Sequence, residues 1–304
     1  MKRTTLFITL LVLIVGCSKP EPINLEEMLI EREGHYFRKD TNKPYSGPVF
    51  SLYRDGQKKE EGILKKGYFD GKHIYWYENG QKKFEKNYSY SPKNELSYWK
   101  LDGEYTEWYS DGQKKEERTY KDGERDGLWI SVWDDMRKTK REGTYIDGKL
   151  NGVVTTWWGG NKRSEITYKD GDWDGLQIYW FYMVNEKKTD IIWYKILEEN
   201  WKDSKLHGLS THWLEGEKTS VRNFKNGKLD GLYTWWYFNG PKKIEVNFKN
   251  GKKVGLLTKW DENGNLIETI DCDKVSCEEE VFKENGGPDY LLTKFYMVDE
   301  FSTR

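Results

Sequence analysis

The sequence predicts an all-β fold, an elongated and twisted single-sheet solenoid of about nine stacked β-hairpins. Two observations support this fold class. The 304 residues contain no alanine but 15 Trp, 21 Tyr and 12 Phe, and the loss of the best helix former together with many aromatic residues favours strands. In addition, a glycine recurs along most of the chain, and each time it is followed by a similar stretch of sequence. A helical bundle and a doubly wound α/β enzyme are therefore disfavoured.

The charge balance argues against a nucleic-acid partner. The chain has 50 basic and 51 acidic side chains and a formal net charge of -1. A protein without a net positive charge has no overall field that attracts a polyanion. We therefore expect no nucleic acid among the partners.

The N-terminus has the features of a lipoprotein signal peptide. Lys2 and Arg3 precede the apolar run Leu6 to Val15, which is too short to span a bilayer core of about 30 Å. The box Ile14-Val15-Gly16-Cys17 resembles the bacterial lipobox, whose cysteine receives lipid. We predict a signal peptide over 1–16, with an ordinary secretory signal as the alternative, and a lipid-anchored Cys17 followed by a tether over 17–42. This predicts the cell envelope, at the outer membrane of a Gram-negative host or the outer face of a Gram-positive cell membrane.

Two further cysteines lie near the C-terminus. With Cys17 used for lipid, Cys272 and Cys277 form an even pair in a compartment where disulfides persist. A disulfide is one interpretation of this pair. The alternative interpretations are two free thiols or a weak metal site, although no histidine lies nearby and the spacing of zinc sites is absent.

The repeat occupies residues 43–270 and begins each time at a glycine. The nine glycines are Gly47, Gly71, Gly103, Gly127, Gly152, Gly175, Gly208, Gly231 and Gly255. Their spacing is about 24 residues, with two insertions near Ser89 to Lys100 and Leu197 to Leu206. Turn dipeptides such as Asn79-Gly80 and Asp122-Gly123 separate the alternating segments, so each copy is predicted to be a β-hairpin.

Alternation within a copy predicts which side chains form the core. The fifth residue after the glycine is tryptophan in seven copies: Trp76, Trp108, Trp157, Trp180, Trp213, Trp236 and Trp260. We expect these side chains, with the first and third positions, to face inward and to replace a missing aliphatic core. In the second strand we expect Ile244, Val246 and Phe248 to face inward, and Lys243 outward.

The opposite strand face is predicted to be a candidate binding surface. Aromatic residues recur at the fourth and sixth positions, and each insertion adds a tryptophan. The candidates are Tyr75, Tyr77, Trp99, Tyr109, Trp133, Trp158, Tyr179, Trp201, Trp235 and Tyr237. They either pack beneath loops between repeats or line a strip that holds sugar rings, a peptide strand or a protein partner.

A basic pair opens the second strand of most copies, as at Lys58-Lys59, Lys82-Lys83 and Lys242-Lys243. Stacking of the copies would align these pairs into a ladder. The ladder is interpreted either as a solvated surface that blocks edge pairing or as a contact for an anionic surface.

The segments YENGQKK, YSDGQKKEERTYKDG and FKNGKLDGLYTWW resemble bacterial MORN-variant repeats of the kind found in YwqK-type antitoxins. The resemblance covers about residues 43 to 270. It implies the hairpin-repeat fold and a membrane-associated or protein-binding scaffold. A cytoplasmic antitoxin role conflicts with the lipobox.

The sequence contains no catalytic set of residues, so we predict no enzyme and no cofactor. The four histidines are scattered, and adjacent carboxylates such as Glu116 and Glu117 point to opposite faces of a strand. The Asp-Gly turns lack the dense spacing of a calcium loop.

The hypothesis that follows is a non-enzymatic, lipid-anchored scaffold with an extended surface for a protein partner or for an envelope glycan or lipid. A carbohydrate- or wall-binding module and an immunity or antitoxin partner are the alternatives. Residues 271–304 break the repeat and are predicted to be a cap or tail at the end of the sheet.

Overall fold

A computed structural model describes residues 20–90, 100–134, 139–184 and 191–277. The chain divides into two compact units, residues 1–100 and 101–304. The described residues form strands and one helix of four residues, and almost all of the strands belong to antiparallel hairpins of the repeat. The predicted all-β fold of stacked hairpins is therefore confirmed. No helix among the described residues is long and apolar enough to cross a membrane.

Unit 1 contains the first two copies of the repeat and a preceding segment. Its elements are β1 (Ile23–Asn24), α1 (Leu25–Met28), β2 (Leu29–Arg32), β3 (His35–Arg38), β4 (Gly47–Leu52), β5 (Lys58–Lys65), β6 (Tyr68–Phe69), β7 (Gly71–Trp76) and β8 (Lys82–Ser89). β4 pairs with β5, β5 with β6 and β7, and β7 with β8, all antiparallel. β1 adds to β4 in parallel, and β2 and β3 form a separate hairpin.

The segment before the first repeat is folded, which corrects the prediction of a tether over 17–42 for its described part. Leu25 and Leu29, from α1 and β2, pack in one buried cluster with Tyr45, Val49 and Leu64. The helix is capped by Asn24, whose side chain accepts hydrogen bonds from two backbone N–H groups of the first turn. Apolar residues at the start of the segment therefore cover the end of the sheet, while Cys17 and the predicted signal peptide lie outside the described residues.

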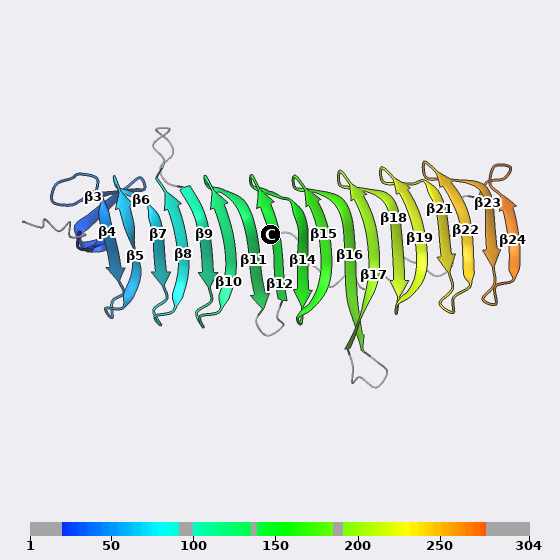
Figure 1. Ribbon diagram of the computed structural model, residues 1–304, viewed down its shortest axis with the longest axis horizontal. Helices are drawn as coiled ribbons and strands as arrows, with labels where there is room; N and C mark the ends of the chain where they lie inside the picture. The colour runs from blue at the N-terminus through cyan, green and yellow to red at the C-terminus, as the bar shows by residue number, and fades with distance from the viewer. Residues whose placement is uncertain (1–19, 91–99, 135–138, 185–190, 278–304) are drawn as a thin grey trace, which may run out of the picture. The chain divides into compact units, whose positions relative to one another are not determined.

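Unit 2 contains the remaining seven copies. Its strands are β9 (Lys100–Trp108), β10 (Lys114–Lys121), β11 (Glu124–Asp134), β12 (Thr139–Ile146), β13 (Lys149–Leu150), β14 (Gly152–Trp158), β15 (Asn161–Lys169), β16 (Asp172–Val184), β17 (Ile191–Lys202), β18 (Lys205–Leu214), β19 (Glu217–Lys225), β20 (Lys228–Leu229), β21 (Gly231–Trp236), β22 (Lys242–Lys249), β23 (Lys252–Trp260) and β24 (Leu266–Asp271). Successive long strands pair antiparallel in chain order, so they lie side by side in one layer (Figure 1). The predicted insertion from Leu197 to Leu206 is part of β17 and β18 rather than a loop.

Two kinds of turn close the hairpins. At one end, both central residues have a positive φ, as at Asp122 (51°) with Gly123 (89°) and Asn250 (50°) with Gly251 (85°). These are two-residue turns of the type that the Asp-Gly and Asn-Gly pairs predicted. At the other end the turns vary. Gly159 (60°) with Gly160 (82°) and Glu215 (53°) with Gly216 (92°) are again two-residue turns, whereas in the turn at Asn79 only Gly80 has a positive φ, 80°, and its N–H donates to the carbonyl of Tyr77. Asn79-Gly80 therefore closes a longer turn ending in a glycine bulge, not a two-residue hairpin.

Neighbouring copies are joined through the two-residue turns. The N–H of Gly251 donates to the carbonyl of Leu229 in the preceding copy, at 2.7 Å. The carboxylate of Asp230, just before the repeat glycine, accepts from the N–H of Asn250 at 3.0 Å. This hydrogen bond lowers the pKa of Asp230. The recurring Asp-Gly at the start of a copy thus fixes the position of the following turn.

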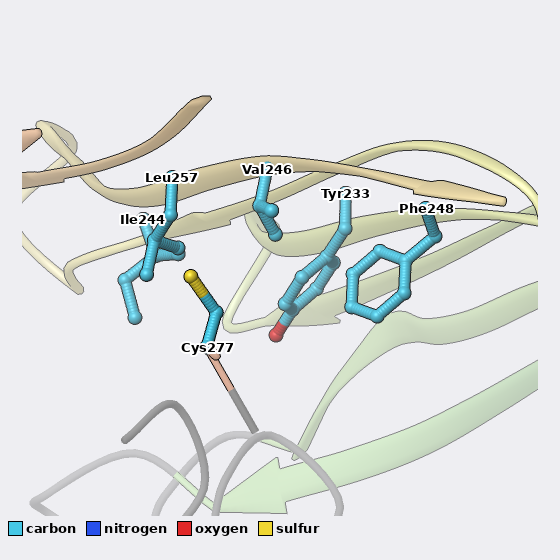
Figure 2. Packing of buried hydrophobic residues seen from close by; sticks show 6 residues of the cluster. All are labelled: Tyr233, Ile244, Val246, Phe248, Leu257 and Cys277. Atoms are coloured by element: carbon cyan, nitrogen blue, oxygen red, sulfur yellow. The ribbon is translucent and has the colours of Figure 1, made fainter. Parts of the chain in front are cut away.

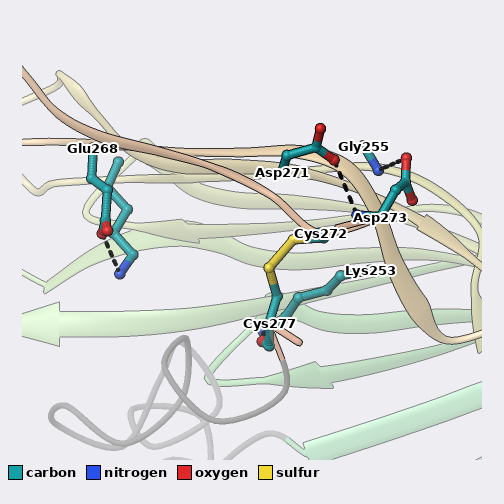
Figure 3. The surroundings of a disulfide bond; sticks show 8 residues. Lys253, Gly255, Glu268, Asp271, Cys272, Asp273 and Cys277 are labelled. Carbon is teal, nitrogen blue, oxygen red and sulfur yellow. Dashed lines mark hydrogen bonds and ion pairs between the residues drawn. A yellow bond between two sulfur atoms is a disulfide. The ribbon is translucent and has the colours of Figure 1, made fainter. Parts of the chain in front are cut away.

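The last copies contain the main described core of unit 2. Tyr233, Ile244, Val246, Phe248 and Leu257 are buried together, and Cys277 packs against them from beyond the last strand (Figure 2). A disulfide joins Cys277 to Cys272, with the Cα atoms 5.5 Å apart (Figure 3). The Lys253 ammonium donates to the Cys277 carbonyl. This arrangement brings the chain after β24 back onto one face of the sheet.

Candidate functional site

The repeat glycine sets the two faces of the sheet. All nine glycines have a positive φ, between 66° and 148°, which favours glycine. We number positions from this glycine. Residues at positions 2, 4 and 6, with their cross-strand partners, lie on one side of the sheet, which we call the even face; those at positions 1, 3 and 5 lie on the odd face.

The even face is the more buried one, which corrects the predicted core at positions 1 and 5. At position 3 the predicted burial is confirmed for Thr155, Thr211 and Thr234. Position 2 is buried in every copy: Val49, His73, Tyr105, Trp129, Val154, Gln177, Ser210, Tyr233 and Leu257. The seven tryptophans at position 5 lie on the odd face and are only half-buried. Their burial was overestimated because strict alternation places residues on two faces without saying which face is covered.

A bulge in each hairpin explains where the tryptophans lie. In the hairpins that carry these tryptophans the register shifts immediately before position 5, for example between Tyr75 and Trp76 and between Trp235 and Trp236. The shift occurs beside the hairpin turn, at the end of the strand. The tryptophans therefore line the margin of the odd face and leave its centre to smaller residues.

The predicted aromatic surface lies on the even face and is half-buried. This holds for Tyr75, Tyr77, Tyr109, Trp158, Tyr179, Trp201, Trp235 and Tyr237. Trp99 and the side chain of Trp133 lie outside the described residues. Binding by these residues stays a prediction.

Two of these tyrosines bridge copies of the repeat. The Tyr237 hydroxyl donates to the Trp260 carbonyl of the next copy at 3.0 Å, and Tyr109 donates to the Val132 carbonyl at 2.7 Å. Tyr53 makes the same bond to the Trp76 carbonyl at 2.6 Å. The tyrosine at the sixth position thus links one copy to the next by a hydrogen bond. This favours the packing interpretation of these tyrosines.

Basic side chains fill the space beside the same aromatic rings. Lys243, predicted to point outward, lies with its Nζ 4.3 Å from the centroid of the Trp235 ring and 5.3 Å from that of Tyr237. Arg163 lies over Trp158 and Phe181 in the same way. Because the bulge adds one residue, the second member of each basic pair turns to the even face. The predicted lysine ladder is therefore divided between the two faces.

Substitution of Tyr237 tests the hydrogen bond between copies. Tyr237→Phe removes the donor to the Trp260 carbonyl but keeps the ring, so we expect a loss of about 1 kcal/mol in the free energy of unfolding. Urea unfolding followed by circular dichroism measures it. Tyr194→Phe is the matched control, since the Tyr194 hydroxyl has no hydrogen-bond partner among the described residues, and we expect it to change stability by less than about 0.5 kcal/mol. Equal losses of stability from the two substitutions would contradict a stabilising hydrogen bond between copies.

The odd face of unit 2 carries a row of exposed aliphatic side chains. These occupy position 1 and are 40–58% exposed: Leu128, Val153, Leu176, Leu209, Leu232 and Leu256. Each faces a smaller polar residue across the strands, as Leu232 faces Asn247. Equivalent positions in neighbouring copies are two strands, about 9.6 Å, apart. The row was missed in the sequence because these leucines alternate in phase with the tryptophans and were placed with them in the core.

Ion pairs flank this row along the odd face. In unit 2 a lysine of the second strand and the glutamate three residues later recur as pairs: Lys114–Glu117, Lys162–Glu165, Lys195–Glu198 and Lys242–Glu245. Unit 1 has the corresponding pairs Lys58–Glu61 and Lys82–Glu85. Residues three apart on a regular strand would point to opposite faces, and the bulge brings them to the same one. The exposed pairs add little stability each, but they neutralise the lysines locally.

Lysine side chains also cover the tryptophans of the odd face. Lys195 Nζ lies 4.1 Å from the centroid of the Trp213 ring, and Lys140 Nζ lies 4.8 Å from that of Trp157. Such contacts are favourable cation–π interactions. A ring face that holds a lysine is less open to stacking by a sugar.

The histidines do not form a site. His73 and His212 are buried on the even face, one in each unit. Burial lowers the pKa of both side chains, and for His212 burial and the charge of Arg222 together lower it to about 3. Within the described ranges, no three His, Cys, Asp or Glu side chains gather as a metal site requires.

Taken together, the fold and the two faces define a β-hairpin repeat protein with one largely buried face and a second face that exposes a row of aliphatic side chains. The family model described as the MORN repeat variant matches residues 69–90, 101–122 and 229–250. Each match begins two residues before a repeat glycine. MORN repeats are generally binding or scaffold repeats and are not typically enzymatic. A comparison with curated proteins found no match.

Proposed function

We propose that this protein is a non-enzymatic scaffold that binds a protein partner through the odd face of its repeats. The observation that carries the proposal is the row of exposed aliphatic side chains from Leu128 to Leu256. Exposed apolar side chains bordered by polar ones are typical of protein interaction sites. The ion pairs beside the row provide such a polar border.

We further propose that lipid on Cys17 holds the scaffold at the cell envelope. The support is the sequence Ile14-Val15-Gly16-Cys17 after a short apolar run. A chain anchored by lipid is confined to a membrane surface, so an extended binding face can engage a partner there at a high local concentration.

The chemistry of the odd face favours a protein over a glycan. Sugar rings stack on open aromatic faces, whereas Trp213 and Trp157 are overlain by lysines and the most exposed apolar groups are leucines. Aliphatic side chains gain most by packing against other apolar side chains. A carbohydrate partner and an immunity role remain distinct outcomes of the test.

Site-specific photocrosslinking in the native host tests the proposal. A benzophenone amino acid is placed at Leu209 or Leu232 and, as a matched control, at exposed Glu262 in the turn before β24. We expect one discrete protein adduct from both leucine positions and none from Glu262. Cys17→Ser is expected to release the protein from the membrane fraction and to reduce the adduct.

The other outcomes would contradict specific parts of the proposal. Adducts to a sugar polymer would replace the protein partner by a glycan. Equal adducts from Glu262 would indicate contact without a binding face, and membrane retention of Cys17→Ser would refute the anchor. A toxin as the single adduct would agree with a protein partner and assign the immunity role.

A further inference from the structure

The even face of unit 2 is buried although its strands form a single layer. Gln177, Ser210 and His212, on β16 and β18, are 1%, 0% and 3% exposed. They lie in adjoining cross-strand rows, since Gln177 pairs with Glu199 and Glu199 with Ser210. A single-layer sheet exposes both faces unless something covers one of them. On the odd face of the same unit, by contrast, the position-1 aliphatic side chains are 40–58% exposed.

Polar atoms on this face lack partners within the described part of the chain. They are Gln177 Nε2, His212 Nδ1, Ser220 Oγ and Arg141 Nε. Ser220 is 0% exposed and faces His212 across β18 and β19. Buried polar groups normally have hydrogen-bond partners in the protein or in ordered water. Whatever covers the even face must therefore bring polar as well as apolar groups.

The chain enters this face at Cys277. The Cys277 side chain is buried against Ile244, Val246 and Leu257, which all point from the even face (Figure 2). The disulfide to Cys272 and the hydrogen bond from Lys253 hold this point in place (Figure 3). Cys277, the last described residue, therefore lies on the even face at β22 and β23.

We propose that the C-terminal segment, residues 278–304, lies across the even face of unit 2 as a built-in ligand. The segment has 27 residues after Cys277, which reach about 89 Å when extended. The five strand intervals from β22 to β16 span about 24 Å. The segment thus reaches the buried polar rows with chain to spare.

Its composition is complementary to that face. The apolar residues include Val281, Phe282, Tyr290, Leu291, Leu292, Phe295, Tyr296 and Met297. Its acidic residues are Glu278, Glu279, Glu280, Glu284, Asp289, Asp299 and Glu300, against Lys283, Lys294 and Arg304. The even face presents arginines, such as Arg141 above the Trp129 ring and Arg222 beside His212. An acidic, aromatic segment can pair with these guanidinium groups and bury the rings between them.

The proposal moves the predicted cap from the end of the sheet to its face. It does not depend on the odd-face partner, because it concerns the opposite side of the sheet. It leaves the odd face of unit 2 as the free surface and makes the even face unavailable to external ligands while the segment is bound.

Photocrosslinking in the full-length protein tests the proposal directly. A benzophenone amino acid at Leu291 or Phe295 is expected to crosslink, by mass spectrometry, to peptides of β16 to β19 in the same chain. Mixing ¹⁴N- and ¹⁵N-labelled chains distinguishes contacts within a chain from contacts between copies. Crosslinks only between copies, only to other proteins, or only to odd-face peptides would overturn the proposal.

A shortened chain provides the second measurement. A variant that ends at Cys277 keeps the disulfide, and we expect amide hydrogen exchange in β16 to β19 to rise at least tenfold. A synthetic peptide of residues 278–304 is expected to restore the slow exchange, whereas a scrambled peptide of the same composition does not. Unchanged exchange in the shortened variant would overturn the proposal, and if that variant fails to fold, the crosslinks in the full-length chain decide.

Discussion

Replacing Gly62 by alanine is expected to destabilise unit 1 by about 3 kcal/mol, because the added methyl group has no space. A Cβ atom at Gly62 on β5 would lie 2.1 Å from Nε2 and 2.2 Å from Cε1 of His73 on β7. The imidazole is 0% exposed and cannot move outward, since the Phe69 and Tyr88 rings lie 4.3 Å and 5.7 Å from its centroid. Its Nε2 also lies 3.0 Å from both the N and O atoms of Ile63.

A double mutant separates this steric effect from a general loss of packing. His73→Ala alone leaves a cavity and is expected to cost about 2–4 kcal/mol. Gly62→Ala in the His73→Ala background places the methyl group in that cavity, so we expect it to be neutral or stabilising. Urea unfolding, with hydrogen exchange of β5 and β7 amides as the reporter of unit 1, measures both steps. Additive effects of the two substitutions would contradict a direct clash.

The sequence was sufficient to predict the hairpins because their determinants are local. The repeat glycines and the Asp-Gly and Asn-Gly pairs require backbone conformations that few other residues adopt. The structure accordingly places Asn250 and Gly251 at positive φ, and it starts a strand at or just before each repeat glycine. A regular spacing then implies stacked copies without any knowledge of long-range contacts.

The buried face could not be predicted in the same way. His73 and Trp76 alternate equally well on either face, and hydrophobicity assigns the core to the tryptophan. Burial depends on position within the strand and on the elements that cover the sheet, which are non-local. Leu25 and Leu29 belong to a short charged segment without repeat periodicity, so their packing on Leu64 had no signal in the sequence.

The candidate surface was misplaced for a related reason. A single inserted residue at each bulge reverses the faces of the following basic pair, and Lys243 therefore turns toward Trp235 rather than to solvent. The bulge has no unique sequence signature. The exposed leucines became recognisable only once the covered face was known.

Lowering the pH from 7 to 5 is expected to destabilise unit 2 through His212. The folded-state pKa of His212 is about 3, because burial and the nearby Arg222 charge disfavour the imidazolium, whereas an unfolded histidine titrates near 6.5. Between these two values the unfolded state binds the additional proton, so stability falls as the pH falls. The contribution is complete above about pH 6.5, and its loss between pH 7 and 5 amounts to about 2 kcal/mol.

The variant His212→Gln isolates this contribution because glutamine does not titrate. Its absolute stability can differ from that of the wild type, since Leu197 and Ser220 flank the position across the strands, so the slope of stability against pH is the measure. We expect a slope about 1 kcal/mol per pH unit smaller in the variant between pH 6 and 5, measured by urea unfolding with hydrogen exchange of β18 amides as the reporter. Ordinary carboxylates titrate mainly below this window, and they are common to both proteins. Parallel curves for the two proteins would mean that His212 takes up a proton in the folded state, and hence that the even face is open to water at β18.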